Sequence, residues 1–424
     1  MLRAELRSAR CPCRVGRERA LRLSLSVGFA FRAPEAETTG MSGAECACYE
    51  TGPIRPPSEG ASLLVRVTRN CSWNRCTFCP VYKGQRFSLR PIDEVKADVQ
   101  AMAATAEAVR DLSHRMGYGG AVTGPVVRML LRQTGRSEVM QVALFLGDGG
   151  QSVFLQDANS LILPVDRLVE VLDEIRRWFP TVSRVTSYAR SRTLCRRSVH
   201  ELERLRGAGL NRIHVGLESG CDEVLRLVEK GVTAEQQIDA GRRVKAAGIE
   251  LSEYVMPGLG GRALSDPHAR DTARALREID PDFVRLRTLA VPPGSPLEAQ
   301  CERGEFELLD DVGVVREIGV LLDGLEGITA RVVSDHVLNL LEEIEGQLPD
   351  DLPKMGAVVD RFLALGESDQ EAFIVARRIG LLRRLEQLDE PAMRVQAELA
   401  LDEVKRCFPG PLHAAVRRAM LRMV

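Results

Sequence analysis

The chain has 424 residues, and its 58 lysines and arginines nearly balance its 59 aspartates and glutamates, which leaves a net charge of −1. This balance excludes a broad electrostatic field that would attract nucleic acid or an anionic membrane. Every apolar run falls short of the roughly 18 residues that a membrane-spanning helix needs. Of eleven cysteines, three cluster and the others scatter, which is typical of a reducing compartment and not of a disulfide framework. We therefore expect a cytoplasmic protein with no membrane partner and no strong nucleic-acid signal.

The first 57 residues differ in composition from the rest of the chain. Arginines recur between Arg3 and Arg32 with few acids among them, and three prolines between residues 53 and 57 interrupt regular structure. We predict a disordered N-terminal extension over residues 1–57, within which Met41 is an alternative start.

From Ser62 onward, short apolar runs alternate with longer segments of helical periodicity, which is the pattern of βα units that build a parallel sheet. Capping boxes at Ser198-x-x-Glu201 and Thr233-x-x-Gln236 open two of the helices. Six runs are predicted as strands, at residues 63–67, 153–157, 184–188, 212–216, 249–255 and 283–289. The sequence therefore predicts an α/β fold, a partial (β/α)6 TIM-like barrel whose core domain covers residues 58–295.

Two segments lie outside this repeat. Residues 106–150 contain glycine-rich stretches around a helical segment, which predicts an insertion within the first βα unit; a phosphate-binding loop would need a Gly-Lys-Ser/Thr ending that is lacking. Residues 296–424 have helical periodicity and predict a C-terminal helical region. One helical stripe in that region comprises Val337, Leu338, Leu340, Leu341 and Ile344.

Three cysteines, Cys71, Cys76 and Cys79, lie within nine residues of a predicted loop after the first strand. Structural zinc usually takes four protein ligands from two separated pairs, and the sequence has no second Cys-x-x-Cys pair. A [4Fe-4S] cluster ordinarily takes four thiolates, so three cysteines would leave one iron open to a small molecule. The alternatives are a zinc site with a distant fourth ligand and three cysteines that hold no metal.

The stretch Cys71-Ser-Trp-Asn-Arg-Cys76-Thr-Phe-Cys79 resembles the cluster loop of the radical S-adenosylmethionine (SAM) enzymes, with an aromatic residue, Phe78, just before the third cysteine. Its spacing of four and two residues departs from the commonest family spacing of three and two, and indicates an uncharacterised branch. The resemblance implies that the cysteines hold a [4Fe-4S] cluster whose fourth iron binds SAM. Reductive cleavage of SAM would then give methionine and a 5′-deoxyadenosyl radical that takes a hydrogen atom from a substrate.

The resemblance also implies which residues contact SAM. Phe78 would pack near the adenine. Relatives have a glycine-rich turn at the end of the second strand, where this chain has Asp157; its carboxylate would meet the SAM amino group, or it forms an Asx turn. Ser187 lies at the end of the third strand, where the family contacts the amino or ribose groups.

Glu218 and Lys230 belong to a segment that is similar to the family's fourth-strand motif. There an acid binds the ribose and a cation twelve residues later meets the SAM carboxylate; the alternatives are a solvated loop acid and a lysine at a helix C-terminus. Met256 begins a turn that resembles the one passing the adenine. Arg285 and Arg287 alternate along the sixth strand, so both face one side, either toward an anionic substrate or the SAM carboxylate, or outward in ion pairs.

The branch that this chain resembles most includes porphyrinogen-oxidising and RNA-thiolating enzymes. The resemblance implies a low-potential electron donor such as flavodoxin or ferredoxin, and a substrate that is a small molecule or a macromolecular side chain. Which residues act on that substrate is unknown. The competing hypothesis is a non-catalytic zinc or iron-sulfur protein with a structural or redox-sensing role.

Overall fold

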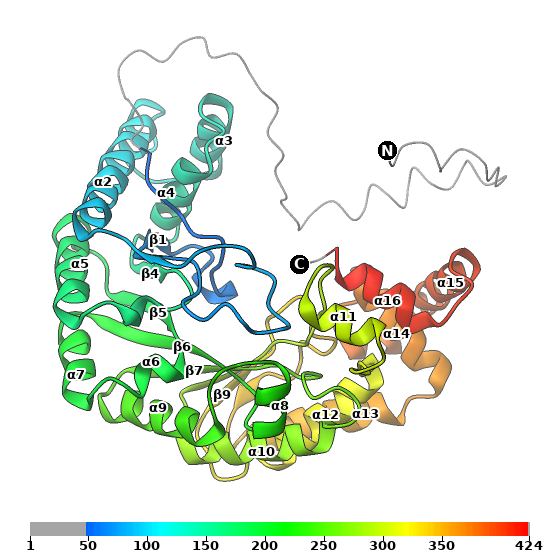
Figure 1. The fold of residues 1–424 in the computed structure, drawn as a ribbon. Helices are drawn as coiled ribbons and strands as arrows, with labels where there is room; N and C mark the ends of the chain where they lie inside the picture. The colour runs from blue at the N-terminus through cyan, green and yellow to red at the C-terminus, as the bar shows by residue number, and fades with distance from the viewer. Residues whose placement is uncertain (1–47, 423–424) are drawn as a thin grey trace. The chain divides into compact units, whose positions relative to one another are not determined.

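The computed structural model describes residues 48–422 (Figure 1). Contacts between Cα atoms divide the chain into two compact units, whose described parts are residues 48–370 and 371–422. The first unit contains all the strands of the described chain and the candidate site. No helix within residues 48–422 is both long and apolar enough to cross a membrane.

The first unit is built on one sheet in which neighbouring strands follow chain order, β1-β4-β5-β6-β7-β8-β9-β10. Its first seven members are parallel, and β10 pairs antiparallel with β9. The first six confirm the predicted strands: β1 (Leu63–Arg66), β4 (Ser152–Gln156), β5 (Arg184–Ala189), β6 (Leu210–Glu218), β7 (Glu250–Val255) and β8 (Phe283–Leu286). The sequence did not predict β9 (Arg331–Val333) or β10 (Gly346–Gln347), because such short strands carry no readable alternation.

Helices follow the parallel strands and lie along the outer side of the sheet (Figure 1), which gives the predicted partial barrel. The longer ones are α2 (Ile92–Arg115), α5 (Val165–Trp178), α7 (Val199–Gly207), α9 (Ala234–Ala246), α10 (Ser265–Ile279), α12 (Asp311–Asp323) and α13 (Leu352–Ala364). The shorter ones are α6 (Ser191–Leu194), α8 (Asp222–Leu227) and α11 (Pro296–Glu302). Both predicted capping boxes are present, at the starts of α7 and α9.

The two faces of the sheet have different chemistry. On the outer face, Val255 lines a small cavity together with side chains of α10 and α12, so this face packs against the helices. On the inner face, aromatic rings of neighbouring strands meet edge to face: Tyr188 lies 5.2 Å from Phe154 and 5.9 Å from His214, between ring centroids. Tyr254 extends the row at 6.1 Å from His214. Because successive strand residues point to opposite faces, each strand contributes to both layers.

The predicted insertion is helical. After the long helix α2, it consists of α3 (Gly124–Gln133) and α4 (Ser137–Gly147), and most of its glycines lie in the connecting turns with positive φ. The three helices share a small hydrophobic core, made of Val109, Leu112, Val126, Leu130, Val139 and Ala143. Gln141 of α4 also donates to the Ser62 carbonyl at 2.6 Å, which joins the insertion to the start of β1.

The segment before the first strand is ordered where the structure describes it, so the prediction of disorder is wrong for residues 48–57. Tyr49 is buried, and its hydroxyl donates to the Glu138 carbonyl. The backbone of Gly52 exchanges hydrogen bonds with the Gln156 amide, and the prolines lead into a 3-10 turn, Pro57–Glu59. Residues 1–47, with Met41, lie outside the described residues.

The C-terminal region is mostly helical, as predicted. The last described helices are α14 (Glu367–Arg378), α15 (Pro391–Cys407) and α16 (Leu412–Met420), with a 3-10 turn at Leu385–Asp389. The boundary between the compact units, after Gln370, lies later than the predicted domain boundary at 295, because α12 contacts α10 and β9 pairs with β8. The predicted helix at 337–344 is wrong: this segment forms irregular turns.

Candidate functional site

The three clustered cysteines lie in a loop between the short antiparallel strands β2 (Thr68–Arg69) and β3 (Ser88–Leu89), directly after β1. Backbone hydrogen bonds fix the middle of this loop. The Thr77 amide donates to the Val228 carbonyl at 3.0 Å, and the Thr77 carbonyl accepts from the Leu297 amide at 3.1 Å. The loop is therefore held against the end of α8 and the start of α11, at the carboxyl end of the sheet, where active sites of βα barrels gather.

The thiols of the loop are close enough to influence one another. Burial raises the pKa of Cys76; Lys230 and Arg190 oppose the rise, whereas Cys79 and Cys71 add to it. Burial also raises the pKa of Cys79, with contributions of the same sign from Cys71 and Glu218. Metal binding must therefore displace protons from these thiols, and the two cations beside Cys76 favour that step.

The donor set fits a cubane cluster. Within residues 48–422, no group of three or more histidine, cysteine, aspartate or glutamate side chains closes around one metal ion. Cysteine thiolates are the ligands of such clusters, and each thiolate of a cubane binds its own iron. Cys71, Cys76 and Cys79 would hold three irons and leave the fourth open.

Trp73, within the loop, makes contacts that the sequence reasoning missed. Its indole Nε1 donates to the Glu229 carbonyl at 2.7 Å, and its ring lies against Gly231, where a Cβ atom would come within 2.2 Å of the ring. The guanidinium groups of Arg75 and Arg190 lie 5.1 Å from the ring centroid. Trp73 therefore fastens the cysteine loop to the segment that carries Lys230. No sequence pattern marks this contact.

The structure brings Glu218 and Lys230 together beside the thiols. Lys230 Nζ lies 3.0 Å from Glu218 Oε1, and the side chains are only 12% and 13% exposed. Glu218 has a φ of 64°, at the point where the register between β6 and β7 shifts. Lys230 acts on the pKa of Cys76 and Glu218 on that of Cys79. The pair thus lies where the sequence expected a SAM contact, and its role as that contact stays a prediction.

Phe78 and Met256 meet in one hydrophobic cluster. Phe78 packs against its buried residues, which are Cys221, Val224, Val228, Met256, Leu259, Leu289, Leu297 and Phe306. The Met256 amide donates to the Glu218 carbonyl at 3.0 Å. The cluster therefore joins the cysteine loop to the strand end that carries Glu218. The contact of Phe78 and Met256 with the adenine stays a prediction.

Ser187 does not lie with the other candidate SAM-binding residues. Its hydroxyl donates to the Leu155 carbonyl at 3.3 Å and lies 3.1 Å from the Tyr188 carbonyl. Ser187 alternates with Tyr188, so it lies on the face of β5 opposite to the row of aromatic rings. A contact between Ser187 and SAM stays a prediction that these hydrogen bonds do not support.

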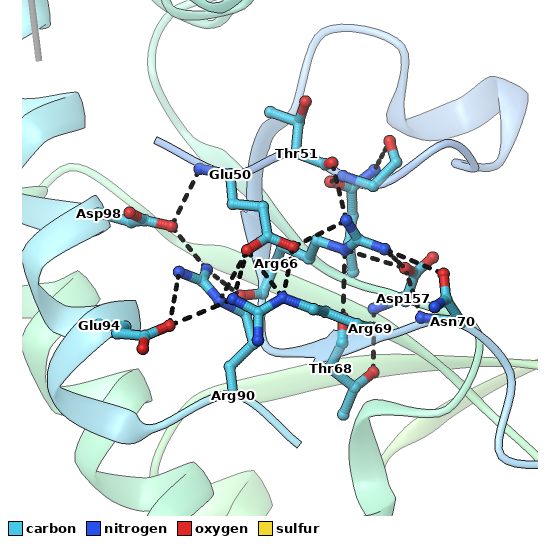
Figure 2. Close-up of polar contacts among 12 residues, drawn as sticks. Glu50, Thr51, Arg66, Thr68, Arg69, Asn70, Arg90, Glu94, Asp98 and Asp157 are labelled. Carbon is cyan, nitrogen blue, oxygen red and sulfur yellow. Dashed lines mark hydrogen bonds and ion pairs between the residues drawn. The ribbon is translucent and has the colours of Figure 1, made fainter. Parts of the chain in front are cut away.

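Asp157 is fully buried at the end of β4, and its carboxylate has several partners (Figure 2). Arg66 donates to Oδ2 from Nη2 at 2.6 Å and from Nε at 3.0 Å. The Asn70 amide donates to the same oxygen at 3.1 Å, and the Tyr82 hydroxyl donates to Oδ1. The carboxylate therefore contacts both ends of the cysteine loop. Its role as a SAM contact stays a prediction.

Arg285 in β8 and Arg287 just after this strand have different surroundings. Arg285 is buried and donates to Asp335 at 2.8 Å and to the Ser252 hydroxyl at 3.2 Å, so its charge is neutralised inside the barrel. Arg287 forms no ion pair with any part of the chain between residues 48 and 422. Burial lowers the pKa of His336 to about 4, and Arg287 adds to this shift. Arg287 thus brings an unneutralised cation to the carboxyl end of the sheet, as an anionic ligand would require.

Comparison with known protein families gives a match to the Radical SAM superfamily over residues 136–273, which begins after the cysteine loop and covers β4 through most of α10. Residues 136–273 therefore form a radical SAM domain, which the cysteine loop precedes. Enzymes of that superfamily use a [4Fe-4S] cluster and SAM.

The curated relatives include tRNA-modifying proteins. A tRNA-2-methylthio-N(6)-dimethylallyladenosine synthase from Alkalilimnicola ehrlichii is 26% identical over 293 residues, which are 68% of this chain and 55% of that protein. A tRNA uridine(34) acetyltransferase from Methanocaldococcus infernus is 28% identical over 111 residues, 26% of this chain and 21% of that protein. The chain therefore spans about half the length of the first of these relatives.

Two solved structures align with part of this chain at low similarity. Methylornithine synthase aligns with 78% of this chain and 85% of its own, at 17% identity and a TM-score of 0.38. The Elp3 protein of Methanocaldococcus infernus aligns with 56% of this chain and 58% of its own, at 16% identity and the same TM-score.

Proposed function

We propose that this protein binds one [4Fe-4S] cluster and SAM and generates a 5′-deoxyadenosyl radical. When bound and reduced, the cluster supplies the electron that cleaves the sulfonium bond of SAM, which yields methionine and the radical. The observation that carries the proposal is the gathering of three thiols, the Glu218–Lys230 pair and the Phe78–Met256 cluster at one end of the sheet. Cofactor chemistry of this kind needs the protein mainly for binding, orientation and exclusion of water.

Each group has a defined task in this proposal. Cys71, Cys76 and Cys79 hold the cluster by three irons. Lys230 meets the SAM carboxylate through a single-point contact, because an ammonium group does not form the bidentate clamp of an arginine, and Glu218 accepts from the ribose hydroxyls. Since the two side chains are paired at 3.0 Å, SAM would insert between them or share their hydrogen bonds.

We further propose a substrate that is either a small molecule or a macromolecular side chain, with flavodoxin or ferredoxin as the class of electron donor. The tRNA-modifying relatives favour a nucleic-acid substrate, but the balanced charge of this chain provides no broad basic surface. The unpaired Arg287 favours a substrate with an anionic group. We place the protein in the cytoplasm, because the eight cysteines within residues 48–422 are all free thiols.

The test is anaerobic reconstitution with iron and sulfide followed by reduction with dithionite in the presence of SAM. The proposal predicts about four irons per chain and release of 5′-deoxyadenosine, which chromatography detects without knowledge of the substrate. One zinc per chain and no cleavage of SAM would support the non-catalytic alternative. A protein that binds iron and SAM but never releases 5′-deoxyadenosine would have kept the fold and lost the activity.

A further inference from the structure

One buried carboxylate connects both ends of the cysteine loop. Asn70, which donates its amide to Asp157 Oδ2 at 3.1 Å, immediately precedes Cys71. Tyr82, which donates its hydroxyl to Asp157 Oδ1, follows Cys79 by three residues. The entry and the exit of the loop are therefore tied to the same side chain at the end of β4, although the strand and the loop are far apart in the sequence.

Arg66 holds this carboxylate in place and connects it to the segment before the first strand. Its guanidinium donates to Asp157 Oδ2 at 2.6 Å on one side and to Glu50 Oε1 at 2.8 Å on the other (Figure 2). Glu50 also binds Arg69 at 2.7 Å. Burial opposes ionisation of Glu50, but its arginine partners outweigh burial and lower its pKa, so Glu50 is charged at neutral pH.

The same segment covers Asp157 with backbone. A Cβ atom at Gly52 would lie 3.1 to 3.2 Å from the carboxylate atoms of Asp157, so a larger residue would require the carboxylate or the chain to shift by a few tenths of an ångström. The Gly52 amide donates to Gln156 Oε1 at 2.8 Å, and Gln156 Nε2 donates back to the Gly52 carbonyl at 3.1 Å. Residues 49–52 thus form a strap that excludes water from the carboxylate, which leaves Asp157 0% exposed.

We propose that Asp157 is the positioning residue of the cluster loop, and that the strap of residues 49–52, through Glu50 and Arg66, keeps it in the position that retains the cluster. This inference rests on the proposed cluster-binding role of the three cysteines. A cluster held by only three thiolates is lost when one of them moves away. A clamp on both loop ends opposes that movement, and ligand-orienting contacts outside the metal shell commonly change metal affinity by about 10- to 100-fold.

The experiment compares the full-length wild type with three variants, Asp157→Asn, Tyr82→Phe and Glu50→Gln, after anaerobic reconstitution. It measures iron and sulfide per chain, the rate at which an iron chelator removes the cluster, the electron paramagnetic resonance spectrum of the reduced cluster, and SAM affinity by equilibrium dialysis. Asp282→Asn is the matched control, since Asp282 binds a cation, Lys245, at 2.7 Å and a backbone amide at 2.8 Å away from the loop.

We expect the chelator to remove the cluster about tenfold faster from Asp157→Asn than from the wild type. The increase in rate should be smaller for Tyr82→Phe and Glu50→Gln, and Asp282→Asn should lose the cluster at the wild-type rate. Tyr82→Phe deletes one hydroxyl at one end of the loop, so its effect is measurable even if Asp157→Asn folds poorly. If all three variants lose the cluster at the same rate as the wild type, the proposal is overturned. If Asp157→Asn loses the cluster at that rate but binds SAM more weakly, Asp157 is a SAM contact instead. Wild-type protein that takes up no iron would overturn the proposed function and this inference together.

Discussion

Lys230 and Glu218 form an ion pair of 3.0 Å directly beside Gly216, where a Cβ atom would lie 2.2 Å from Glu218 Oε1 and 3.0 Å from Lys230 Nζ. The missing side chain of Gly216 provides the room in which two charged groups from β6 and the segment after α8 meet. The pair is mostly buried, so its charges interact strongly with whatever enters the site.

The first prediction concerns this pair. Lys230→Met keeps much of the length of the side chain and removes its charge, and a hydrogen bond to a charged group contributes about 1.5–3 kcal/mol. We expect SAM affinity to fall by roughly 10- to 100-fold, with the iron content unchanged, as measured by equilibrium dialysis on the reconstituted protein. Lys245→Met is the control, because Lys245 forms a 2.7 Å ion pair with Asp282. Unchanged SAM affinity in Lys230→Met would remove Lys230 from the site.

The second prediction concerns the central thiol. Cys76→Ala removes one of only three protein ligands, so the iron content after reconstitution should fall from about four per chain to near zero. The far-ultraviolet circular dichroism should stay unchanged, because backbone hydrogen bonds at Thr77 hold the loop. Cys407→Ala, at an exposed cysteine, should retain all the iron. A Cys76→Ala protein with a complete cluster would contradict the ligand assignment.

The third prediction concerns the contact between Trp73 and Gly231. Gly231 has a φ of 71°, and so does Gly304, which has open space around it. Gly304→Ala should therefore cost only the left-handed backbone penalty of about 1–2 kcal/mol, measured by urea unfolding. Gly231→Ala should cost more and also reduce the iron content, because the new methyl group displaces the Trp73 ring and the loop with it.

A double variant checks this interpretation. Trp73→Ala removes the ring that the new methyl group strikes, so the additional cost of Gly231→Ala over Gly304→Ala should disappear in the Trp73→Ala background. If the additional cost persists without the ring, it comes from the backbone of residue 231 and not from the contact.

The fourth prediction concerns the pH dependence of stability and two buried side chains, Glu317 of α12 and His268 of α10. Burial raises the pKa of Glu317 from 4.5 to about 7, and burial lowers the pKa of His268 from 6.5 to about 4. The Glu317 contribution to stability is complete below pH 4.5 and is lost as the pH rises through 7. The His268 contribution is complete above pH 6.5 and is lost as the pH falls through 4. Between pH 4.5 and 6.5 the two contributions change in opposite directions.

Substitution of either residue should make the pH dependence caused by the other one measurable. In Glu317→Gln the free energy of unfolding should rise with pH between 4.5 and 6.5 more steeply than in the wild type, and in His268→Gln it should fall, by about 3 kcal/mol over the full range in each case. Urea unfolding at a series of pH values measures both slopes. Parallel pH profiles of the wild type and both variants would show that these groups titrate normally in the folded protein.

The sequence predicted the six main strands and both capping boxes, because each has a local pattern: apolar runs at the right spacing, and Ser198 or Thr233 three residues before its partner. It did not predict the irregular turns at 337–344, whose leucines repeat with helical spacing but are buried without forming a helix. Burial alone gives apolar residues no particular backbone conformation.

The candidate site was predicted in part. Cys71, Cys76 and Cys79 share one loop, so their spacing was visible, and Glu218 and Lys230 belong to a recognisable segment. The strap was not predicted, because Glu50, Arg66 and Asp157 meet only in the folded chain; Arg66 and Asp157 alone are 91 residues apart in the sequence. Charged residues in a proline-containing segment have no periodicity that would distinguish a strap from a disordered extension.

The alternation of side chains along the strands separates residues that line the interior from residues that pack against the helices. His214 and Tyr254 face the ring-lined interior, whereas Val215 and Val255 face the helices. A substitution of the first kind changes the lining of the interior, whereas one of the second kind changes the packing of the sheet against the helices. Adjacent positions of one strand can therefore be varied with separate consequences, one for the interior and one for the scaffold.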